Sequence, residues 1–443
     1  MHTTNLLRQK TPVYGDRFRD CFGIHVSTAA ISGVYVIVIL HLSSLYPPTS
    51  VGGAERVAAI LGETQASAGH QVYASSLVKA PQPPSHRGGV VAWPLRARNP
   101  LWIQTSAKYP APVRLANKVA TVFNGRISSE FGILLDDIQP DVLHTHSMVE
   151  LPPSVWGQAA RRHIPVVHTL HDYDLLCIRA ALFKDGHKCE QRHLVCRALS
   201  APKQALHNHI DVVAAVSATV LDTHRQHGLF GHLPVNRTAV IWNPTRAENS
   251  PVTRKPRPPG TPLRFGYLGR LVGEKGLGLI LKACRLIPAE GWTLRVAGEG
   301  PERVAFEAMA SWLPVEFRGY VKAAEFLSEI DVLICAPLWD EPFGLTTLEA
   351  YNAGCRVIGT SSGVIGEVVE AIEPGWTIAP GDIQALANAM SKALREGSAL
   401  PDTRRSAASG LLRTLDPKVV SAKYLELYDL ARAVKRHAAA KNG

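Results

Sequence analysis

The segment DEPFGLTTLEA, residues 340–350, does most to define the fold and chemistry of this 443-residue chain. Glu341 and Glu349 stand eight positions apart, and the Gly-Leu-Thr-Thr run between them predicts the start of a helix. A helix N-terminus offers free backbone N–H groups and the positive end of the helix dipole, so it suits a diphosphate. A carboxylate before the turn can hold sugar hydroxyls, and one within the helix can hold a ribose. The segment therefore predicts a nucleotide-sugar site; the alternative is an acidic turn followed by an exposed helical glutamate.

Alternating strand and helix patterns surround this segment. In the second half, strands are expected at Leu263–Leu268, Trp292–Ala297, Val315–Arg318, Val332–Ala336 and Arg356–Gly359, and helices at Leu277–Leu286, Glu302–Ser311 and Thr346–Ala353. In the first half, strands are expected at Val34–Leu42, Gln71–Ser76, Asp141–His146, Val166–His171 and Asp211–Ser217, and helices at Ala54–Ala68 and Ile127–Ile138. This alternation predicts two α/β halves, each with a doubly wound parallel sheet.

Composition shifts divide the chain further. Residues 246–262 read RAENSPVTRKPRPPGTP, and this proline-rich, basic stretch predicts a linker between a domain at 34–245 and one at 263–417. Residues 81–112 hold many prolines and predict an irregular excursion, suited to an acceptor-side loop. Residues 1–33 form a leader without a defined role. The apolar run 34–40 is too short to span a bilayer, so a buried strand is favoured over a membrane anchor.

Two loops carry glycines where a strand ends. Residues 51–56 read VGGAER, and paired glycines such as Gly53 let the backbone approach a phosphate closely, although such pairs also occur for steric reasons. In the second half, Gly269 ends a strand, and Arg270 and Lys275 follow it. Two cations at this edge can neutralise a diphosphate, whereas the alternative is a solvated basic loop.

Histidines end two strands of the first half. His171 follows a buried strand and is well placed to hydrogen-bond a sugar in a cleft. Strand alternation turns His168 to the opposite face. Of His144 and His146, the second is the better candidate for a cleft residue. A zinc site would need a third ligand that the sequence does not identify.

These motifs resemble the retaining glycosyltransferases of the GT-B fold, family 4. The resemblance runs from about Val34 to the C-terminus and is most specific over residues 263–370. It is carried by the Glu-x7-Glu pair, the Gly-Arg…Lys-Gly loop at 269–276, the Thr-x-His at 169–171 and the glycine loop around Gly53. Two segments depart from the family pattern: Pro244 stands where glycine is usual, and 361–367 differs from Gly-Gly-x-Pro-Glu.

The resemblance implies two Rossmann-like domains facing a cleft, with a final helix in 418–443 that crosses back to the first domain. It implies retaining transfer of a sugar from a nucleotide diphosphate sugar to a hydroxyl of a glycan or lipid-linked acceptor, in polysaccharide or glycoconjugate biosynthesis, with no metal required. For the diphosphate, the resemblance implies Arg270, Lys275 and the backbone of Gly344, Leu345 and Thr346. Glu341 and His171 are implied for the sugar and Glu349 for the ribose. Gly53 and Gly269 are implied in the glycine loops, and Arg318 and Gly319 beside the base. Alternatives are a non-catalytic nucleotide-sugar-binding protein and a GT-B phosphorylase or epimerase.

The charge is concentrated in the first half. The formal net charge is +11; residues 1–250 hold 24 Lys+Arg against 16 Asp+Glu, hence +8, and the remainder holds 24 against 21, hence +3. A basic half can contact an anionic membrane, and no nucleic-acid motif accompanies it. The sequence thus favours a cytoplasmic protein, at the inner face of the membrane if it docks there.

Seven cysteines are too few for a disulfide scaffold of this size, so a reducing compartment is expected. Cys177, Cys189 and Cys196 lie within twenty residues, with His187 and His193 between them. Their spacing is not that of a standard zinc motif, so both a structural metal clip and ordinary thiols remain open, with thiols favoured.

Overall fold

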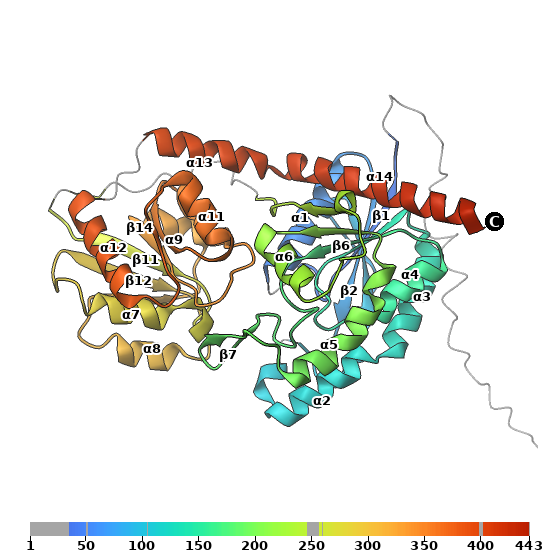
Figure 1. Ribbon diagram of the computed structural model, residues 1–443, viewed down its shortest axis with the longest axis horizontal. Helices are drawn as coiled ribbons and strands as arrows, with labels where there is room; N and C mark the ends of the chain where they lie inside the picture. The colour runs from blue at the N-terminus through green and yellow to red at the C-terminus, as the bar shows by residue number, and fades with distance from the viewer. Residues whose placement is uncertain are drawn as a thin grey trace, which may run out of the picture.

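The computed structural model describes residues 35–49, 52–103, 105–245, 257–258, 260–397 and 402–442. These residues form two α/β domains that lie side by side, each built on a mainly parallel sheet (Figure 1). The leader at 1–33 lies outside the described residues, as does most of the linker at 246–262.

The first domain is built on an eight-stranded sheet of described residues. In spatial order its strands are β10 (Thr238–Val240), β9 (Val212–Ala215), β6 (Val166–Leu170), β5 (Val142–Thr145), β1 (Val38–Leu42), β2 (Gln71–Val78), β4 (Val90–Arg96) and β3 (Ser85–Arg87), and only the β3–β4 pair is antiparallel. The helices of this domain are α1 (Gly53–Ser67), α2 (Ala111–Val122), α3 (Gly125–Ile138), α4 (Ser154–Arg161), α5 (Leu194–Leu206) and α6 (Ala218–Gln226). The strand order reverses between β1 and β5, which marks the switch point where ligands bind in such sheets.

The second domain repeats this plan with six strands in its described part. Their spatial order is β13 (Val315–Gly319), β12 (Trp292–Ala297), β11 (Leu263–Leu268), β14 (Val332–Cys335), β15 (Arg356–Thr360) and β16 (Thr377–Ile378), all parallel. The helices are α7 (Leu277–Cys284), α8 (Arg303–Met309), α9 (Ala323–Ser328), α10 (Leu345–Asn352), α11 (Gly363–Ile372), α12 (Ile383–Glu396) and α13 (Asp402–Thr414). Here the order reverses between β11 and β14.

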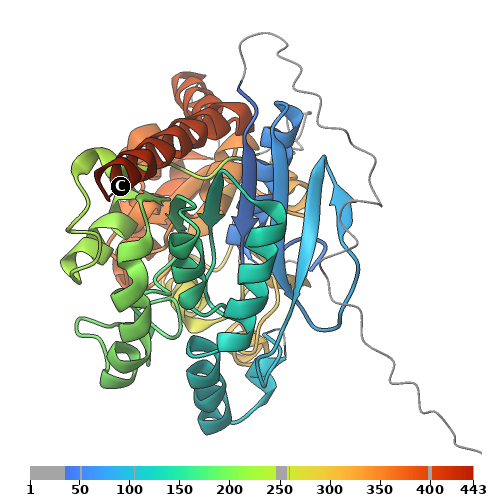
Figure 2. The ribbon, with the colours of Figure 1, turned by 90° about the vertical axis from the view of Figure 1, so that its right-hand side faces the viewer.

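The last helix, α14 (Pro417–Asn442), follows α13, which lies over the second domain, and runs along the first domain (Figures 1 and 2). Tyr424 and Tyr428 project from it into a core shared with α1 and the sheet, and both are fully buried. Lys435 forms an ion pair with Asp211 at 3.0 Å. No helix in the described part of the chain is long and apolar enough to cross a bilayer.

Most strands expected from the sequence are present, and several match to the residue, including Leu263–Leu268 and Trp292–Ala297. The first strand begins later than expected, at Val38. Tyr35 and Val36 before it are 68% and 52% exposed, so the apolar run at 34–40 is only partly a core strand.

The expectation that 81–112 is an irregular excursion was wrong for part of that range. Strand β4 pairs in parallel with β2, and β3 adds an antiparallel strand at its edge. The misleading signal was Pro94, since proline usually argues against a strand. However, β3 pairs only with Val90–Ala92, so β4 is an edge strand at Pro94, where the missing N–H costs nothing.

Candidate active site

Lys275 and Glu341 meet at the switch point of the second sheet. Lys275 Nζ lies 2.8 and 2.6 Å from the two carboxylate oxygens of Glu341, and Trp339 Nε1 donates to the same carboxylate at 2.9 Å. The side chains of Lys275 and Glu341 are 22% and 16% exposed, so the pair is accessible to a ligand yet partly shielded from water. The structure thus joins two predicted site residues that are 66 positions apart.

The Lys275 loop fits closely against the end of β14 because residue 276 is a glycine. Gly276 has φ +79°, and a Cβ at this position would lie 1.8 Å from the carbonyl oxygen of Ala336. Any side chain here would push Lys275 away from Glu341. Local steric crowding therefore explains why the residue after Lys275 in the predicted Lys-Gly motif is a glycine.

Arg270 and Arg318 lie outside this pair. Arg270 follows Gly269 at the end of β11, and its side chain is 69% exposed with Glu274 3.8 Å away. Arg318 lies on the edge strand β13, where Glu316 and Glu329 hold it at 3.5 and 3.3 Å. Gly319 accepts a hydrogen bond from the Gly298 N–H at 2.8 Å. The partners of Arg318 are therefore acidic side chains, and Arg318 does not line the pocket between α1 and α10.

Helix α10 begins at the predicted Gly344, which serves as N-cap in the left-handed conformation with φ +60°. A Cβ there would lie 2.6 Å from Ile365 Cγ1, so glycine is needed for both conformation and space. The N–H groups of Leu345 and Thr346 lie in the first helical turn, which leaves such groups without partners inside the helix. The segment can therefore present donors to an anion.

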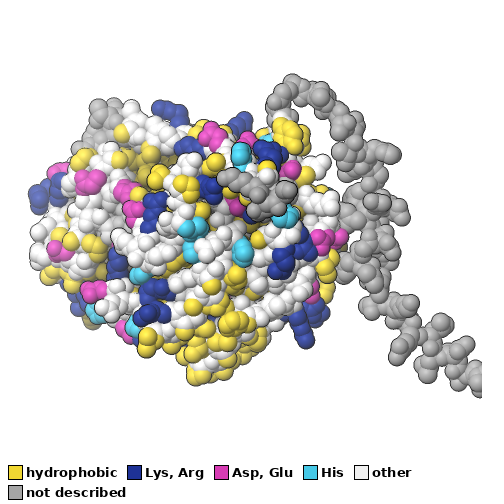
Figure 3. Space-filling view, turned by 45° about the vertical axis from the view of Figure 1, so that its right-hand side comes forward, with side chains coloured by type: hydrophobic (Ala, Val, Ile, Leu, Met, Phe, Trp, Pro, Cys, Tyr) yellow, Lys and Arg dark blue, Asp and Glu magenta, His cyan; other side chains and the backbone are white. Residues whose placement is uncertain are grey.

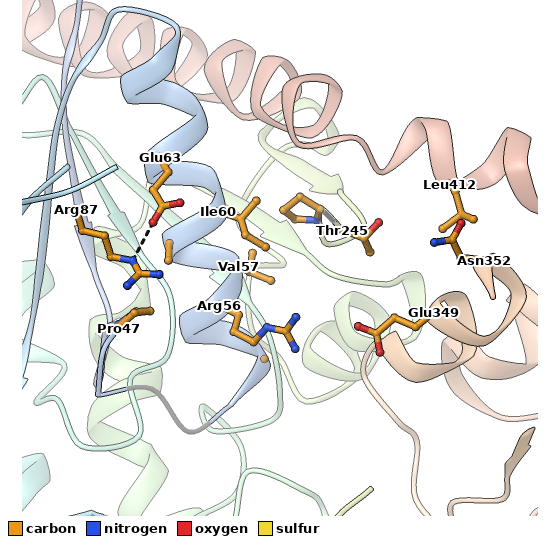
Figure 4. Close-up of a pocket in the computed structure, with 13 residues that line it drawn as sticks. Pro47, Arg56, Val57, Ile60, Glu63, Arg87, Thr245, Glu349, Asn352 and Leu412 are labelled. Atoms are coloured by element: carbon orange, nitrogen blue, oxygen red, sulfur yellow. Dashed lines mark hydrogen bonds and ion pairs between the residues drawn. The ribbon is translucent and has the colours of Figure 1, made fainter. Parts of the chain in front are cut away.

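A pocket of about 250 Å³ lies between α1 and α10. Gly53 and Arg56 line it from the first domain, and Glu349 lines it from the second. Arg56 and Glu349 point toward one another across the space (Figure 4). The pocket thus brings Gly53 and Glu349, both predicted from sequence, to one place and adds Arg56, a cation that the sequence analysis did not single out.

His171 directly follows β6 and is partly buried. Its Nε2 lies 3.0 Å from His146 Nδ1, while its Nδ1 is buried without a hydrogen-bond partner among the described residues. Burial and the nearby His168 lower the pKa of His171 to about 3, so the ring is neutral near pH 7. The expectation that His146 faces the cleft was wrong: it is 1% exposed and lies behind His171. His168 points to the opposite side, against Trp156, as strand alternation predicts.

Two acids beside the loops of the first domain have raised pKa values. Burial, followed by the carboxylate of Asp174, raises the pKa of Asp172 to about 8. Burial likewise raises the pKa of Glu55, and its Oε2 has no partner among the described residues. Asp174 instead stays charged because Lys203 pairs with it at 3.0 Å.

The segment after His171 connects the two domains. Tyr173 OH donates to the backbone oxygen of Asp340 at 3.3 Å, and its ring packs edge-on against Trp339. The small hairpin of β7 (Phe183–Lys184) and β8 (His187–Lys188) places Lys188 in an ion pair with the Asp340 carboxylate. The first domain therefore contacts Asp340, which directly precedes Glu341.

The cysteines of this segment form no disulfide among the described residues. Cys177 Sγ and Cys196 Sγ lie 4.0 Å apart, and Cys189 is a free thiol. In the part of the chain that the structure describes, one group of three side chains has metal-ligand atoms within 4.8 Å of one another, and it consists of His41, His144 and His146. The three cysteines do not form such a group.

Two Rossmann-like domains, with a pocket between them and a lysine–glutamate pair at the switch point, define a glycosyltransferase of the GT-B class. Residues 51–248 match the family described as Glycosyltransferase Family 4, and residues 262–396 match the family described as Glycosyl transferases group 1. The chain therefore belongs to these glycosyltransferase families, with Glycosyltransferase Family 4 in its N-terminal part and Glycosyl transferases group 1 in its C-terminal part.

Two relatives are similar to this chain over most of their length and of its own. The chain is 27% identical over 338 residues to an uncharacterized 42.6 kDa protein in the cps region of Klebsiella pneumoniae, covering 74% of this chain and 87% of that one. It is 26% identical over 421 residues to a glycogen synthase of Mycobacterium tuberculosis, covering 90% and 96%.

Solved structures share the fold. Sucrose-phosphate synthase from Thermosynechococcus elongatus superposes with a TM-score of 0.70 at 19% identity, covering 90% of this chain and all of that one. Anabaena Alr3699/HepE, solved with UDP and glucose, gives a TM-score of 0.64 at 17% identity, covering 88% and 98%.

Several residues of the site were missed from sequence. Trp339 stands two positions before Glu341, and Arg56 closes the predicted glycine loop, so nearness to a motif was a usable signal for both. Tyr173 could have been found in the same way beside His171. His41 contacts His146, which follows β5, and Gln65 contacts Tyr428 of α14; no local sequence signal indicates either contact.

Proposed function

We propose that this glycosyltransferase retains the anomeric configuration while moving a hexose-type sugar from a nucleoside diphosphate sugar to a hydroxyl group. The acceptor is a glycan or a lipid-linked saccharide, and the setting is assembly of a cell-surface polysaccharide. The relative from a cps region and the neighbour with bound UDP and glucose support this choice.

The observation that carries the proposal is the pocket shared by Gly53, Arg56 and Glu349, the last of which lies in the same helix, α10, whose N-terminus follows Gly344. A carboxylate can accept both hydroxyl hydrogens of a ribose. The positive end of the helix, with Arg56, then suits the diphosphate that follows the ribose. Glu341 and Lys275 extend the same binding track toward the transferred sugar.

The chemistry assigned to the protein is charge stabilisation and positioning. As the glycosidic bond breaks, negative charge grows on the leaving diphosphate, and Lys275, Arg270 and the α10 N-terminus oppose it. The leaving phosphate accepts the proton of the attacking acceptor hydroxyl on the same face of the sugar, which accounts for retention. Glu341 holds sugar hydroxyls, and His171 orients the sugar near its anomeric carbon.

Donor recognition can be tested by a thermal-shift screen against UDP-, GDP-, ADP- and dTDP-sugars and against each free nucleoside diphosphate. We expect one base to raise the melting temperature of the wild-type protein. Glu349→Ala should lose the shift with both free nucleotide and donor, because the ribose contact is common to them. Glu341→Ala should keep the shift with free nucleotide and lose the extra shift that the sugar adds.

Asn352→Ala is a matched control for Glu349→Ala, since Asn352 lines the same pocket without a charge. Equal losses in the two glutamate variants would contradict the division of roles. If no nucleotide shifts the wild-type protein, the donor proposal fails. Product analysis with the active donor, with and without free phosphate, separates transfer from phosphorolysis and epimerisation.

We also propose that the first domain docks on an anionic membrane from the cytoplasmic side. Hydrophobic side chains gather at the lower end of the molecule in Figure 3. Helices α2 and α5 pack against each other and carry exposed apolar side chains: Val113 and Val119 in α2, Phe123 at its C-terminal end, and Leu194 and Val195 in α5. Phe123 is 68% and Leu194 77% exposed. Exposed basic residues stand within the same segments, at Lys108, Arg114, Arg126 and Arg197. Apolar insertion beside basic charge suits a peripheral contact with acidic lipids.

Co-sedimentation with vesicles that contain phosphatidylglycerol tests this surface. We expect binding that falls as salt rises from about 0.05 to 0.5 M, because the charge attraction is screened. Phe123→Ser and Leu194→Ser should each weaken it. Trp312→Ser is the control, since Trp312 is fully exposed on the other domain. Absent or salt-independent binding would contradict the proposal.

A further inference from the structure

A buried polar network lies under α14 at the switch point of the first sheet. His41 of β1 and His144 of β5 are register partners, and His146 follows two residues later on the same face. His41 and His146 are each 1% exposed, and His144 and Gln65 are fully buried. Transfer chemistry makes no direct use of these groups, yet the network ends at His171.

The network contains one continuous path. Gln65 Nε2 donates to Tyr428 OH at 3.1 Å, and Gln65 Oε1 lies 2.8 Å from His41 Nε2. His41 Nδ1 lies 3.0 Å from His146 Nε2, and His146 Nδ1 lies 3.0 Å from His171 Nε2. The path therefore runs from α14 through α1, β1 and β5 to the loop after β6.

Each ring on this path is neutral, so it carries one N–H and one lone pair. Desolvation lowers the pKa of His41 to about 4 and that of His146 well below 6.5. The amide oxygen of Gln65 can only accept, so His41 must donate from Nε2 and accept at Nδ1. His146 then donates from Nε2 and accepts at Nδ1, and His171 donates from Nε2.

We propose that Gln65, His41 and His146 are positioning residues that fix His171 as its Nε2–H tautomer, leaving the Nδ1 lone pair to accept a hydrogen bond from a donor-sugar hydroxyl. The buried Nδ1 of His171 without a partner among the described residues is the end point that a ligand would satisfy. The ligand assignment rests on the proposed function, whereas the tautomer does not. The hydrogen-bond path thus determines that His171 presents an acceptor, and not a donor, to the sugar.

Two alternatives to this path involve the same side chains. A rotated Gln65 amide would reverse every bond on the path and leave His171 with an Nδ1–H. A metal held by His41, His144 and His146 would compete with existing bonds, because all six of their ring nitrogens have partners: His144 contacts Tyr428 OH and Thr169 Oγ1, each at 2.7 Å. The amide orientation in the structure, with Oε1 toward His41 and Nε2 toward Tyr428, corresponds to the Nε2–H form.

The tautomer can be read directly by ¹⁵N NMR of the full chain labelled at histidine, at pH 7 and without any donor. The His171 signals are identified by their loss in His171→Ala. We expect a protonated Nε2 and an unprotonated Nδ1 in the wild-type protein. Gln65→Leu removes the directing oxygen, and Tyr428→Phe frees the amide to rotate, so both variants should lose the single tautomer and show Nδ1–H as well.

Tyr424→Phe is the matched control, because Tyr424 lies one turn away on α14 and contacts Thr169 instead of Gln65. It should keep the wild-type tautomer. An Nδ1–H in the wild-type protein overturns the proposal, and so does an unchanged single tautomer in both Gln65→Leu and Tyr428→Phe. If the tautomers behave as expected but no nucleotide sugar binds, the donor assignment fails and the positioning path stands.

Discussion

Acidification from pH 7 to pH 5 is expected to destabilise this protein steeply, before most surface carboxylates are protonated. Six buried histidines have pKa values below the ordinary 6.5: about 4 for His41, His168 and His224, about 3 for His171, and well below 6.5 for His144 and His146. Their common cause is desolvation, which favours the neutral ring. Between about pH 4 and 6.5 the unfolded chain therefore binds more protons than the folded one.

The stability that these rings contribute is fully present above pH 6.5 and is lost as the pH falls toward 4. Each histidine changes the free energy of unfolding by up to about 1.4 kcal/mol per pH unit in this window. Asp172 and Glu55 act in the opposite direction, since their raised pKa values mean that the folded state holds extra protons. The six histidine protons, set against the one proton that Asp172 holds, leave a difference of at most about five protons, an upper limit near 7 kcal/mol per pH unit that Glu55 lowers further.

Urea unfolding at pH 7, 6 and 5 measures this slope. His224→Leu should reduce it by about one proton, because His224 is buried against Tyr173 and Phe230 and its Nε2 has no partner among the described residues. His193→Gln, at an exposed position, controls for loss of a histidine as such. A stability that is flat from pH 7 to 5 would mean that the folded protein takes up as many protons in this range as the unfolded chain, so the buried rings would not have lowered pKa values.

Lys275→Ala is expected to cost about 2–4 kcal/mol of transition-state stabilisation, roughly a 30- to 1000-fold loss of kcat/KM. The lysine is the cation that the structure fixes most firmly beside Glu341, with two contacts under 3 Å and a position over the Trp339 ring. Without it, the charge that develops on the leaving diphosphate would be opposed by Arg270 and the α10 N-terminus alone.

The measurement is steady-state transfer with the donor found by the thermal-shift screen. Lys282→Ala, an exposed lysine on the adjacent helix α7, is the matched control and should keep wild-type turnover. The melting temperature of Lys275→Ala must also be compared with wild type, because its loss leaves Glu341 without its cation. A correctly folded Lys275→Ala enzyme with unchanged turnover would exclude the diphosphate role.

Local sequence patterns were sufficient to predict most of the fold. Strand periodicity located the central strands of both sheets and helix periodicity located part of the helices that cover them, because period-2 and period-3.6 patterns depend only on residues a few positions apart. The same logic placed His171, Gly269 and Gly344 at strand or helix ends. It failed at β4, where Pro94 gave a local signal against a strand that an edge position tolerates.

The sequence by itself determined the family, the two α/β halves and the motifs Gly269–Gly276 and Glu341–Glu349. Only the tertiary structure decided which of these residues meet. Gln65 and Tyr428 are 363 positions apart, and Lys275 and Glu341 are 66 apart, so no periodicity links them. Their contacts arise because α14 buries its apolar face on the first sheet and because strand order brings β11 beside β14. The packing of complete helices and strands depends on the hydrophobic surface that they bury together. This packing brings Gln65 to Tyr428 and Lys275 to Glu341, and so determines which hydrogen-bond donors and acceptors face the site.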